Sequence, residues 1–283
     1  MAASGTTPGA VLVTGATGTT GSRVTARLAA AGHRVRAAGR HGTPVEGAEA
    51  VRFEWNDPAT HAEALTGADR VYLVPPPGAP DPAAVMLPFL RRARTAGVRR
   101  AVLLSSSAIP AGGPGVGQVH RALPELFDEW AVLRPSWFMQ NFTGDHVHAR
   151  SIRDRGIIET ATGEGRVAFV DADDIAAVAV HALTDAEAPD TDLVITGPEA
   201  LSHREVAALL TGITGRPVTH RQLSHGELRQ RLASVVPEAF AALLADLDRA
   251  IAAGAEDRTT DTVQRLTGRP PRDFRTFAER ATA

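Results

Sequence analysis

The sequence predicts an α/β protein built on a doubly wound parallel sheet, with a smaller C-terminal α/β lobe for the substrate. In the first half of the 283-residue chain, short runs of β-forming residues alternate with stretches of helical period. Such alternation forms βαβ units and a parallel sheet with helices on both faces. Gly15, Gly18 and Gly21 separate the first expected strand from the first expected helix, a spacing typical of a nucleotide-binding turn.

Six strands are expected in this half, with helical stretches between them. The first helix, over 19–31, is amphipathic and is closed by Gly32, and another follows the fourth strand over 82–97. Right-handed crossovers bring the carboxyl ends of parallel strands to one rim, where ligands bind. The expected strands are AVLVT (10–14), HRVRAA (33–38), VRFEW (51–55), RVYLV (70–74), AVLLSS (101–106) and WAVLRP (130–135).

The alternation loosens from about residue 140, and the remaining chain is mostly helical. One helix there starts with Ser202 and Glu205 at the spacing of a capping box. We therefore expect residues 1–150 to form a dinucleotide-binding domain of the Rossmann type. Residues 151–283 are expected to form a smaller, mostly helical substrate-binding lobe, interleaved with the last strands of the sheet.

The composition excludes several classes of function. Net charge is −2 and there is no basic block, so neither nucleic acid nor a membrane is expected as a partner. With no cysteine and no apolar signal segment, we expect a cytoplasmic monomer or homodimer that acts on a small-molecule substrate. All 30 basic residues are arginines, and Tyr72 is the only tyrosine. Mechanisms that need Tyr-x-x-x-Lys, a Schiff-base lysine or a P-loop lysine are therefore excluded.

The stretch VLVTGATGTTGSRV predicts a dinucleotide site. Glycine permits the sharp turn, the close approach of backbone N–H groups to a pyrophosphate, and tight packing of helix on strand. Threonine hydroxyls in the same turn add donors, and the alternative is a glycine-rich turn without a ligand. The predicted contacts are Gly15, Thr17, Gly18, Thr19, Thr20 and Gly21.

The nucleotide is expected to be NADP(H). An NAD site usually places an acidic residue at the end of the second strand, where it holds the ribose 2′-hydroxyl. Here that region reads AAGRH, with Arg40 and no acid. A guanidinium suits a 2′-phosphate, which a carboxylate would repel. The alternative is that Arg40 is a solvated loop residue.

Several longer stretches, in order along nearly the whole chain, carry a family resemblance. They are VLVTGATGTTGSRV, FEWNDPAT, VYLVPPPGAPDP, RRAVLLSSSAI, GGPGVGQVHRAL, VLRPSWFMQNF, VAFVDADDIA and LTGRPPRDF. Together they resemble the NmrA-like atypical short-chain dehydrogenases/reductases, and within these the ergot-alkaloid dehydrogenases of the festuclavine and agroclavine type. The glycine loop is common to many families, whereas LRPSWFMQNF together with VYLVPPP is much more specific.

The resemblance implies NADPH-dependent reduction of a C=N bond in a cyclic iminium, in secondary metabolism, by a family that also lacks the Tyr/Lys pair. It also implies which residues contact the cofactor. The implied contacts are Gly15, Thr17, Gly18, Thr20, Gly21 and Arg40 for the phosphates, Val74 and Pro75 along the cofactor, Ser105 near the nicotinamide ribose, and Pro135, Trp137 and Phe138 beside the nicotinamide.

The region GQVHRALPELF stands where short-chain reductases normally carry their Tyr and Lys. Hydride delivery to a ketone creates a strongly basic alkoxide, so a positioned acid accelerates it by roughly 10²–10⁴. Delivery to an iminium cation gives a neutral amine and needs no proton. The absence of the Tyr/Lys pair therefore counts against a ketone as the substrate. It leaves an iminium ion or a quinone as the substrate, or a protein that catalyses no reaction. His120 is the remaining candidate for acid–base catalysis, and the alternative is a surface or capping residue.

The segment after the sixth expected strand predicts the wall of a substrate pocket. Trp137, Phe138, Met139 and Phe142 are large and apolar, and they cannot all share one helical face. At least one is expected to reach a pocket suited to a flat cationic ring, while others pack the core. With Asn141, these four are the predicted substrate-binding residues.

No metal site is expected. Asp145 and His148 could share one helix face, but no third ligand is evident. The carboxylates in DADDIA, Asp171, Asp173 and Asp174, are better explained by a helix N-terminus, and we assign them a structural role.

The sequence thus favours an NADPH-dependent reductase acting on a small cyclic imine, iminium or similar conjugated electrophile. One alternative is an NADPH quinone reductase of the same fold. Another is a non-catalytic NADP redox sensor, and a third is a relative that performs a non-redox cyclisation or isomerisation.

Overall fold

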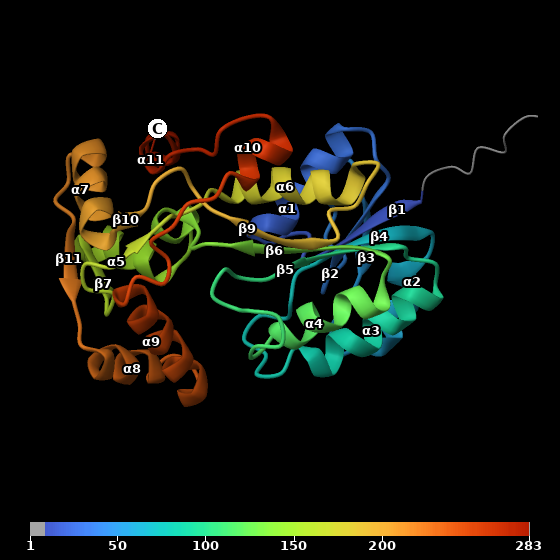
Figure 1. Ribbon diagram of the computed structural model, residues 1–283, viewed down its shortest axis with the longest axis horizontal. Helices are drawn as coiled ribbons and strands as arrows, with labels where there is room; N and C mark the ends of the chain where they lie inside the picture. The colour runs from blue at the N-terminus through green and yellow to red at the C-terminus, as the bar shows by residue number, and fades with distance from the viewer. Residues whose placement is uncertain (1–8, 283) are drawn as a thin grey trace, which may run out of the picture. The chain divides into compact units, whose positions relative to one another are not determined.

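The protein is built on a seven-stranded sheet of order β3-β2-β1-β4-β5-β6-β9, as seen in a computed structural model that describes residues 9–282 (Figure 1). Each pair of neighbours from β1 to β6 runs parallel. The order reverses where β1 lies between β2 and β4, and open α/β sheets bind ligands at such a switch point. The strands are β1 (Ala10–Thr14), β2 (Val35–Gly39), β3 (Glu49–Arg52), β4 (Ala68–Leu73), β5 (Arg100–Leu104), β6 (Glu129–Pro135) and β9 (Thr191–Ile195).

Two pairs of short strands lie outside this sheet. In one, β7 (Ile157–Thr160) runs parallel to β11 (Thr219–Gln222). In the other, β8 (Arg166–Val167) runs antiparallel to β10 (Leu201–Ser202). These pairs were not anticipated, because such short segments carry little periodicity.

Helices cover both faces of the seven-stranded sheet, with α1 and α6 on one face and α3 and α4 on the other (Figure 1). No helix in the described part of the chain is both long and apolar enough to cross a membrane. The helices are α1 (Thr19–Ala30), α2 (His61–Leu65), α3 (Ala83–Thr95), α4 (Gly117–Leu126), α5 (Val147–Arg155), α6 (Ala172–Thr184), α7 (His203–Thr214), α8 (His225–Ala233), α9 (Glu238–Ala252), α10 (Thr262–Thr267) and α11 (Phe274–Thr282), with 3₁₀ turns η1 (Pro58–Thr60) and η2 (Met139–Phe142).

The predicted fold class and its six strands are confirmed, with one strand displaced. The third strand was expected over 51–55 but ends at Arg52. Beyond it, Phe53 and Trp55 are buried, each edge-on to Phe89 of α3. Burial of these aromatic rings explains the early end of the strand, because their apolar surface is large. The predicted capping box of Ser202 and Glu205 is confirmed at the start of α7.

Contacts divide the chain into two compact units that alternate along the sequence. The first unit runs to Ser105 and includes Ile109–Arg134 and Ala176–Leu193. The second contains Ser106–Ala108, Pro135–Ile175 and Val194–Ala283. The division into domains at residue 150 stays a prediction.

A buried arginine ties the sheet of the first unit to the end of α6. The side chain of Arg100, on β5, is only 4% exposed, and its Nε donates to Glu129 at 2.6 Å. One terminal nitrogen donates to the carbonyls of Leu183 at 3.2 Å and Asp185 at 2.7 Å. The guanidinium therefore satisfies carbonyls at the helix C-terminus, where the dipole favours a positive charge.

Replacing this arginine should destabilise the protein far more than replacing an exposed one. Arg100→Met leaves Glu129 and the carbonyls unpaired, and we expect a loss of about 3–5 kcal/mol in the free energy of unfolding. Arg94→Met removes the exposed pair with Asp128 and should cost less than about 1 kcal/mol. Urea denaturation of both variants measures the difference, and equal losses would contradict the role given to Arg100.

Candidate functional site

The loop between β1 and α1 requires glycine at two positions. Gly15 has φ of +61°, and a Cβ there would approach the Val74 side chain to 3.1 Å. A Cβ on Gly21 would lie 2.1 Å from the Gly15 carbonyl oxygen, far inside contact distance. The first turn of α1 is therefore pressed directly against the loop, and a larger side chain would push the two apart.

The N-terminus of α1 is free to receive an anion. Its N-cap is Gly18, which has no side chain that could cap the helix, and the first turn holds no acidic residue. Uncapped N–H groups and the helix dipole together suit a pyrophosphate. Thr17 and Thr19 are exposed beside this turn. Thr20 is buried, and its side chain lies beside the Tyr72 phenol.

Hydrogen bonds fix the end of β4 next to the loop. The Val74 N–H donates to Thr14 Oγ1 at 2.7 Å, and this hydroxyl donates to the Tyr72 carbonyl at 3.1 Å. The Trp55 indole N–H donates to the Val74 carbonyl at 3.2 Å. Both backbone groups of Val74 are therefore held, and Pro75 follows directly. Sequence reasoning did not identify Thr14 or Trp55, whose partners lie far along the chain.

Two further predicted cofactor residues follow β2 and β5 of the first unit, the strands on either side of β1 and β4. Arg40 is exposed directly after β2, whose Ala38 lies opposite Thr14 of β1. Ser105 follows β5, and its Oγ is buried without a hydrogen-bond partner among residues 9–282. An orphaned hydroxyl suits a ligand oxygen, since an unsatisfied buried polar group is costly. With the glycine loop, these residues fit a dinucleotide.

Other strand-end residues have partners within the second unit. The Pro135 carbonyl accepts a hydrogen bond from the Ser107 N–H at 2.9 Å. The Ser107 hydroxyl donates to the buried carboxylate of Glu256 at 2.7 Å. This bond ties the C-terminal segment to the residues after β5, so Ser107 is engaged in the structure of that unit.

Neither the tyrosine nor His120 offers an ordinary proton donor. Tyr72 is fully buried within β4, and burial raises the pKa of its phenol. His120, on α4, is 5% exposed, and its Nδ1 has no hydrogen-bond partner in the described chain. Burial lowers the pKa of His120; the Asp192 carboxylate opposes this and Arg134 adds to it. The imidazole is therefore neutral at pH 7, and its catalytic role stays a prediction.

The second unit contains a pocket of about 360 Å³ that two predicted substrate residues line. These residues are Trp137 and Asn141, just after β6. Segments of α5, β7, α8 and α9 complete the pocket. Mostly apolar walls with a few polar groups are typical of small-molecule sites. The other apolar lining residues are Val147, Leu228, Leu232, Val235, Leu244 and Leu247.

The remaining residues of the predicted wall do not line this pocket. Met139 and Phe142 are 1% and 4% exposed and belong to the core of the second unit. Phe142 packs edge-on against Phe169, with ring centroids 5.1 Å apart. Phe138 is half-buried and pairs with Val170 through a β-bridge. These three residues hold the segment in place, while Trp137 and Asn141 face the cavity.

Four charged side chains line the pocket, and three of them are paired with one another. Glu159, on β7, forms ion pairs with Arg155 at 2.8 Å and with Arg231. Burial opposes ionisation of Glu159, but hydrogen bonds from Arg231 and Arg155 lower its pKa overall. The fourth is Asp248 of α9, and burial raises its pKa to about 6. Sequence reasoning identified none of these residues, which come from separate elements.

Four histidines gather beside this pocket, and His146 and His148 line it. The ring of His203 lies 6.0 Å from that of His148 and 5.7 Å from that of His220. Burial lowers the pKa of all four, that of His148 to about 3. Within residues 9–282, no group of three or more His, Asp and Glu residues is placed to hold a metal ion.

The carboxylates of DADDIA have structural partners, in keeping with their predicted role. Asp171 and Asp174 are fully buried. Asp171 accepts from the Asp173 N–H at the start of α6, and Arg272 forms ion pairs with both of these acids. Asp174 accepts from the Arg272 N–H at 2.7 Å. These bonds hold the segment before α11 against the start of α6.

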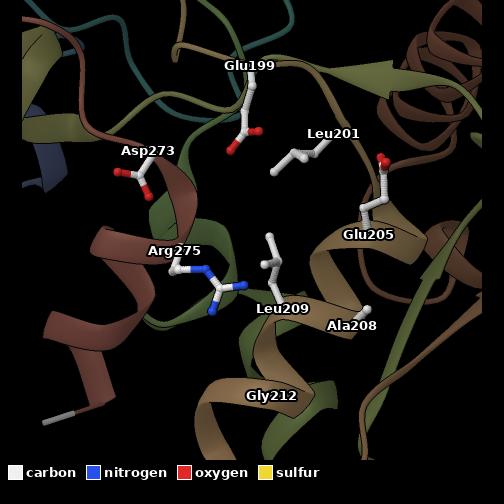
Figure 2. Close-up of a pocket in the computed structure, with 8 residues that line it drawn as sticks. All are labelled: Glu199, Leu201, Glu205, Ala208, Leu209, Gly212, Asp273 and Arg275. Carbon is white, nitrogen blue, oxygen red and sulfur yellow. The ribbon is translucent and has the colours of Figure 1, made fainter.

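Another hollow of the second unit, of about 560 Å³, lies beside α7 and α11 (Figure 2). Figure 2 shows Glu199, Leu209 and Arg275 pointing toward this space. Its other acids are engaged at helix starts: Glu205 in the capping box of α7, and Asp273 with the Thr276 N–H at 2.8 Å. It contains none of the predicted site residues, so the pocket at Trp137 is the better candidate for the substrate.

Comparison with known proteins identifies the family and the fold. The profile of the NAD(P)H-binding family matches residues 15–186. The uncharacterized oxidoreductase YesF of Bacillus subtilis is 46% identical over 269 residues, covering 95% of this chain and 93% of the relative. Festuclavine synthase II of Penicillium roqueforti is 37% identical, covering 95% and 97%. The crystal structure of the Escherichia coli NADPH-dependent quinone oxidoreductase QOR2 shares the fold, with a TM-score of 0.81, 23% identity, and coverage of 96% and 100%.

The buried histidines should make the folded protein sensitive to acid. Below pH 6.5 the unfolded chain gains a proton at His148, whereas the folded protein keeps this ring neutral down to about pH 3. Stability is therefore lost as pH falls, by about 2 kcal/mol from this residue between pH 7 and 5. His148→Asn loses the contact with Phe142 at every pH but should show a shallower decline, measured by denaturation between pH 7.5 and 5.

The matched control is His41→Asn, at an exposed position of the first unit. Its stability should fall with pH as steeply as that of the wild type. If His148→Asn declined equally steeply, the titration assigned to His148 would be wrong.

Proposed function

Since this chain belongs to the NAD(P)H-binding family, and is an NAD(P)H-dependent oxidoreductase, we propose that it reduces the C=N bond of small cyclic iminium ions. One observation carries the proposal: the chain has no lysine, and its only tyrosine is fully buried within β4. A substrate that needs no protein acid suits such a site. Relatives named festuclavine synthase, at 37% and 38% identity, are in keeping with the ergot-alkaloid dehydrogenase resemblance, which implies this substrate class.

The chemistry of the acceptor explains why no acid is needed. When bound, the dinucleotide supplies a hydride from its nicotinamide to the electrophilic carbon. The π electrons of the C=N bond become the lone pair of nitrogen, so the cation is converted to a neutral amine. A ketone would instead become an alkoxide, and protonating it is the task of a general acid.

The contribution of the protein is then binding and orientation. The glycine loop and the N-terminus of α1 would hold the pyrophosphate, and the fixed backbone of Val74 would support the cofactor alongside. Trp137 and the aliphatic side chains of the pocket would orient a flat ring and exclude water. Correct orientation of two reactants contributes several kcal/mol to catalysis. His120 has no required role in this scheme.

We further propose that the cofactor is NADPH. Arg40 is exposed at the end of β2 and carries the charge that a 2′-phosphate needs. The family profile alone covers both nucleotides. A guanidinium forms bidentate, charge-assisted hydrogen bonds with a phosphate. NADH has a hydroxyl in place of the 2′-phosphate and cannot form these bonds.

Reversal of the charge at Arg40 tests the choice of nucleotide. Arg40→Glu should raise the KM for NADPH by roughly 10- to 100-fold, from the usual strength of charged hydrogen bonds, and leave that for NADH nearly unchanged. The control is Arg34→Glu, exposed before the other end of the same strand, which should alter neither KM. An equal effect on both nucleotides would refute the assignment.

The activity is tested by following NADPH oxidation with a set of acceptors. An N-methyl dihydroisoquinolinium should be reduced to its tertiary amine, and a ketone of the same shape should not react. Gly21→Val, which cannot close the glycine loop, is the control for reaction outside the site. Oxidation of NADPH by benzoquinone but by no iminium ion would establish a quinone reductase instead.

A further inference from the structure

The pocket at Trp137 contains one carboxyl group, that of Asp248, for which the described residues 9–282 provide no ion pair. Oδ2 of Asp248 accepts a hydrogen bond of 2.7 Å from the Ala161 N–H. Within residues 9–282, Asp248 forms no ion pair and no other hydrogen bond. Asp248 is half-buried. A carboxylate that is partly shielded from water and has no cation beside it is unfavourable, and an arriving cation would relieve that cost.

The surroundings of Asp248 keep this charge effective. Leu244 and Leu247 precede it on α9, and Leu228 and Leu232 line the pocket from α8. Charges interact more strongly in such an apolar environment than in water. Trp137 adds an aromatic face, to which a flat cation is attracted.

The positive groups of the pocket do not cancel the charge of Asp248. Arg155 and Arg231 both pair with Glu159, and their side chains are 48% and 45% exposed. Water screens such exposed charges, so their effect on a ligand beside Asp248 is small. His146 and His148 are kept neutral at pH 7 because burial lowers their pKa.

We propose that Asp248 binds the cationic centre of the substrate, so that the pocket selects flat monocations over neutral rings of the same shape. The inference rests on the proposed function, because it takes this pocket as the substrate site. It assigns to Asp248 the recognition of the positive charge of the substrate. Asp248 acts through binding, and hydride transfer needs no proton from it.

Equilibrium binding, measured by calorimetry without NADPH turnover, tests this role. The probes are N-methylisoquinolinium, which is permanently cationic, and isoquinoline N-oxide, a neutral ring of similar shape. Asp248→Asn should weaken binding of the cation by roughly 10- to 100-fold, the usual range for a charged partner, and change binding of the N-oxide little. Asp248→Glu keeps the charge and should retain most of the affinity.

The matched control is Asp246→Asn on the same helix. Asp246 is exposed and pairs with His225 and Arg249, so its loss should not affect the cation. Unchanged N-oxide binding by Asp248→Asn shows that the pocket remains folded. Three results would each overturn the inference. Asp248→Asn could lose binding of both probes, or it could bind the cation as tightly as the wild type does. The wild type could also bind the cation no more tightly than the N-oxide.

These binding measurements, together with the assay of iminium reduction, separate this inference from the proposed function. If the cation binds in an Asp248-dependent manner but no iminium ion is reduced, Asp248 recognises charge and the proposed reaction is wrong. If iminium ions are reduced and Asp248→Asn leaves both their KM and the binding of the cation unchanged, the reaction stands and the role of Asp248 is wrong.

Discussion

The close packing of Gly21 against the Gly15 carbonyl is the constraint on which the nucleotide end of this protein depends. The distance of 2.1 Å that a Cβ would have from this oxygen leaves room only for hydrogen. Because α1 starts directly on the loop, its free N–H groups lie at the switch point of the sheet. The Val74 backbone is held beside this point through Thr14 and Trp55. One short contact thus sets the place of helix, loop and neighbouring strand end.

A second constraint limits the chemistry. The only tyrosine of the chain is a core residue of β4, and no lysine is available to lower the pKa of a phenol. The fold of a reductase is therefore present without its usual acid. An acceptor that becomes neutral on receiving hydride resolves this difficulty, and an unpaired carboxylate such as Asp248 suits the charge of that acceptor before it reacts.

The features that could be predicted from sequence depend on local pattern. The glycine spacing, six strands and the capping box at Ser202 each lie within one short segment. Residues whose positions depend on distant partners could not be predicted. Asp248 meets Ala161 from 87 residues away, and Trp55 meets Val74 from the segment after another strand. The early end of β3 and the burial of Met139 likewise follow from tertiary packing.

The central claim, that the protein supplies no proton during reduction, is tested most directly by isotope effects in a single turnover. The acceptor is an N-methyl dihydroisoquinolinium, with the rate of NADPH oxidation as the measurement. The account predicts that deuterium at the transferred position of NADPH slows the reaction, and that D₂O as solvent leaves the rate unchanged in both wild type and His120→Asn. A rate that falls in D₂O for the wild type, and loses this sensitivity in His120→Asn, would contradict it.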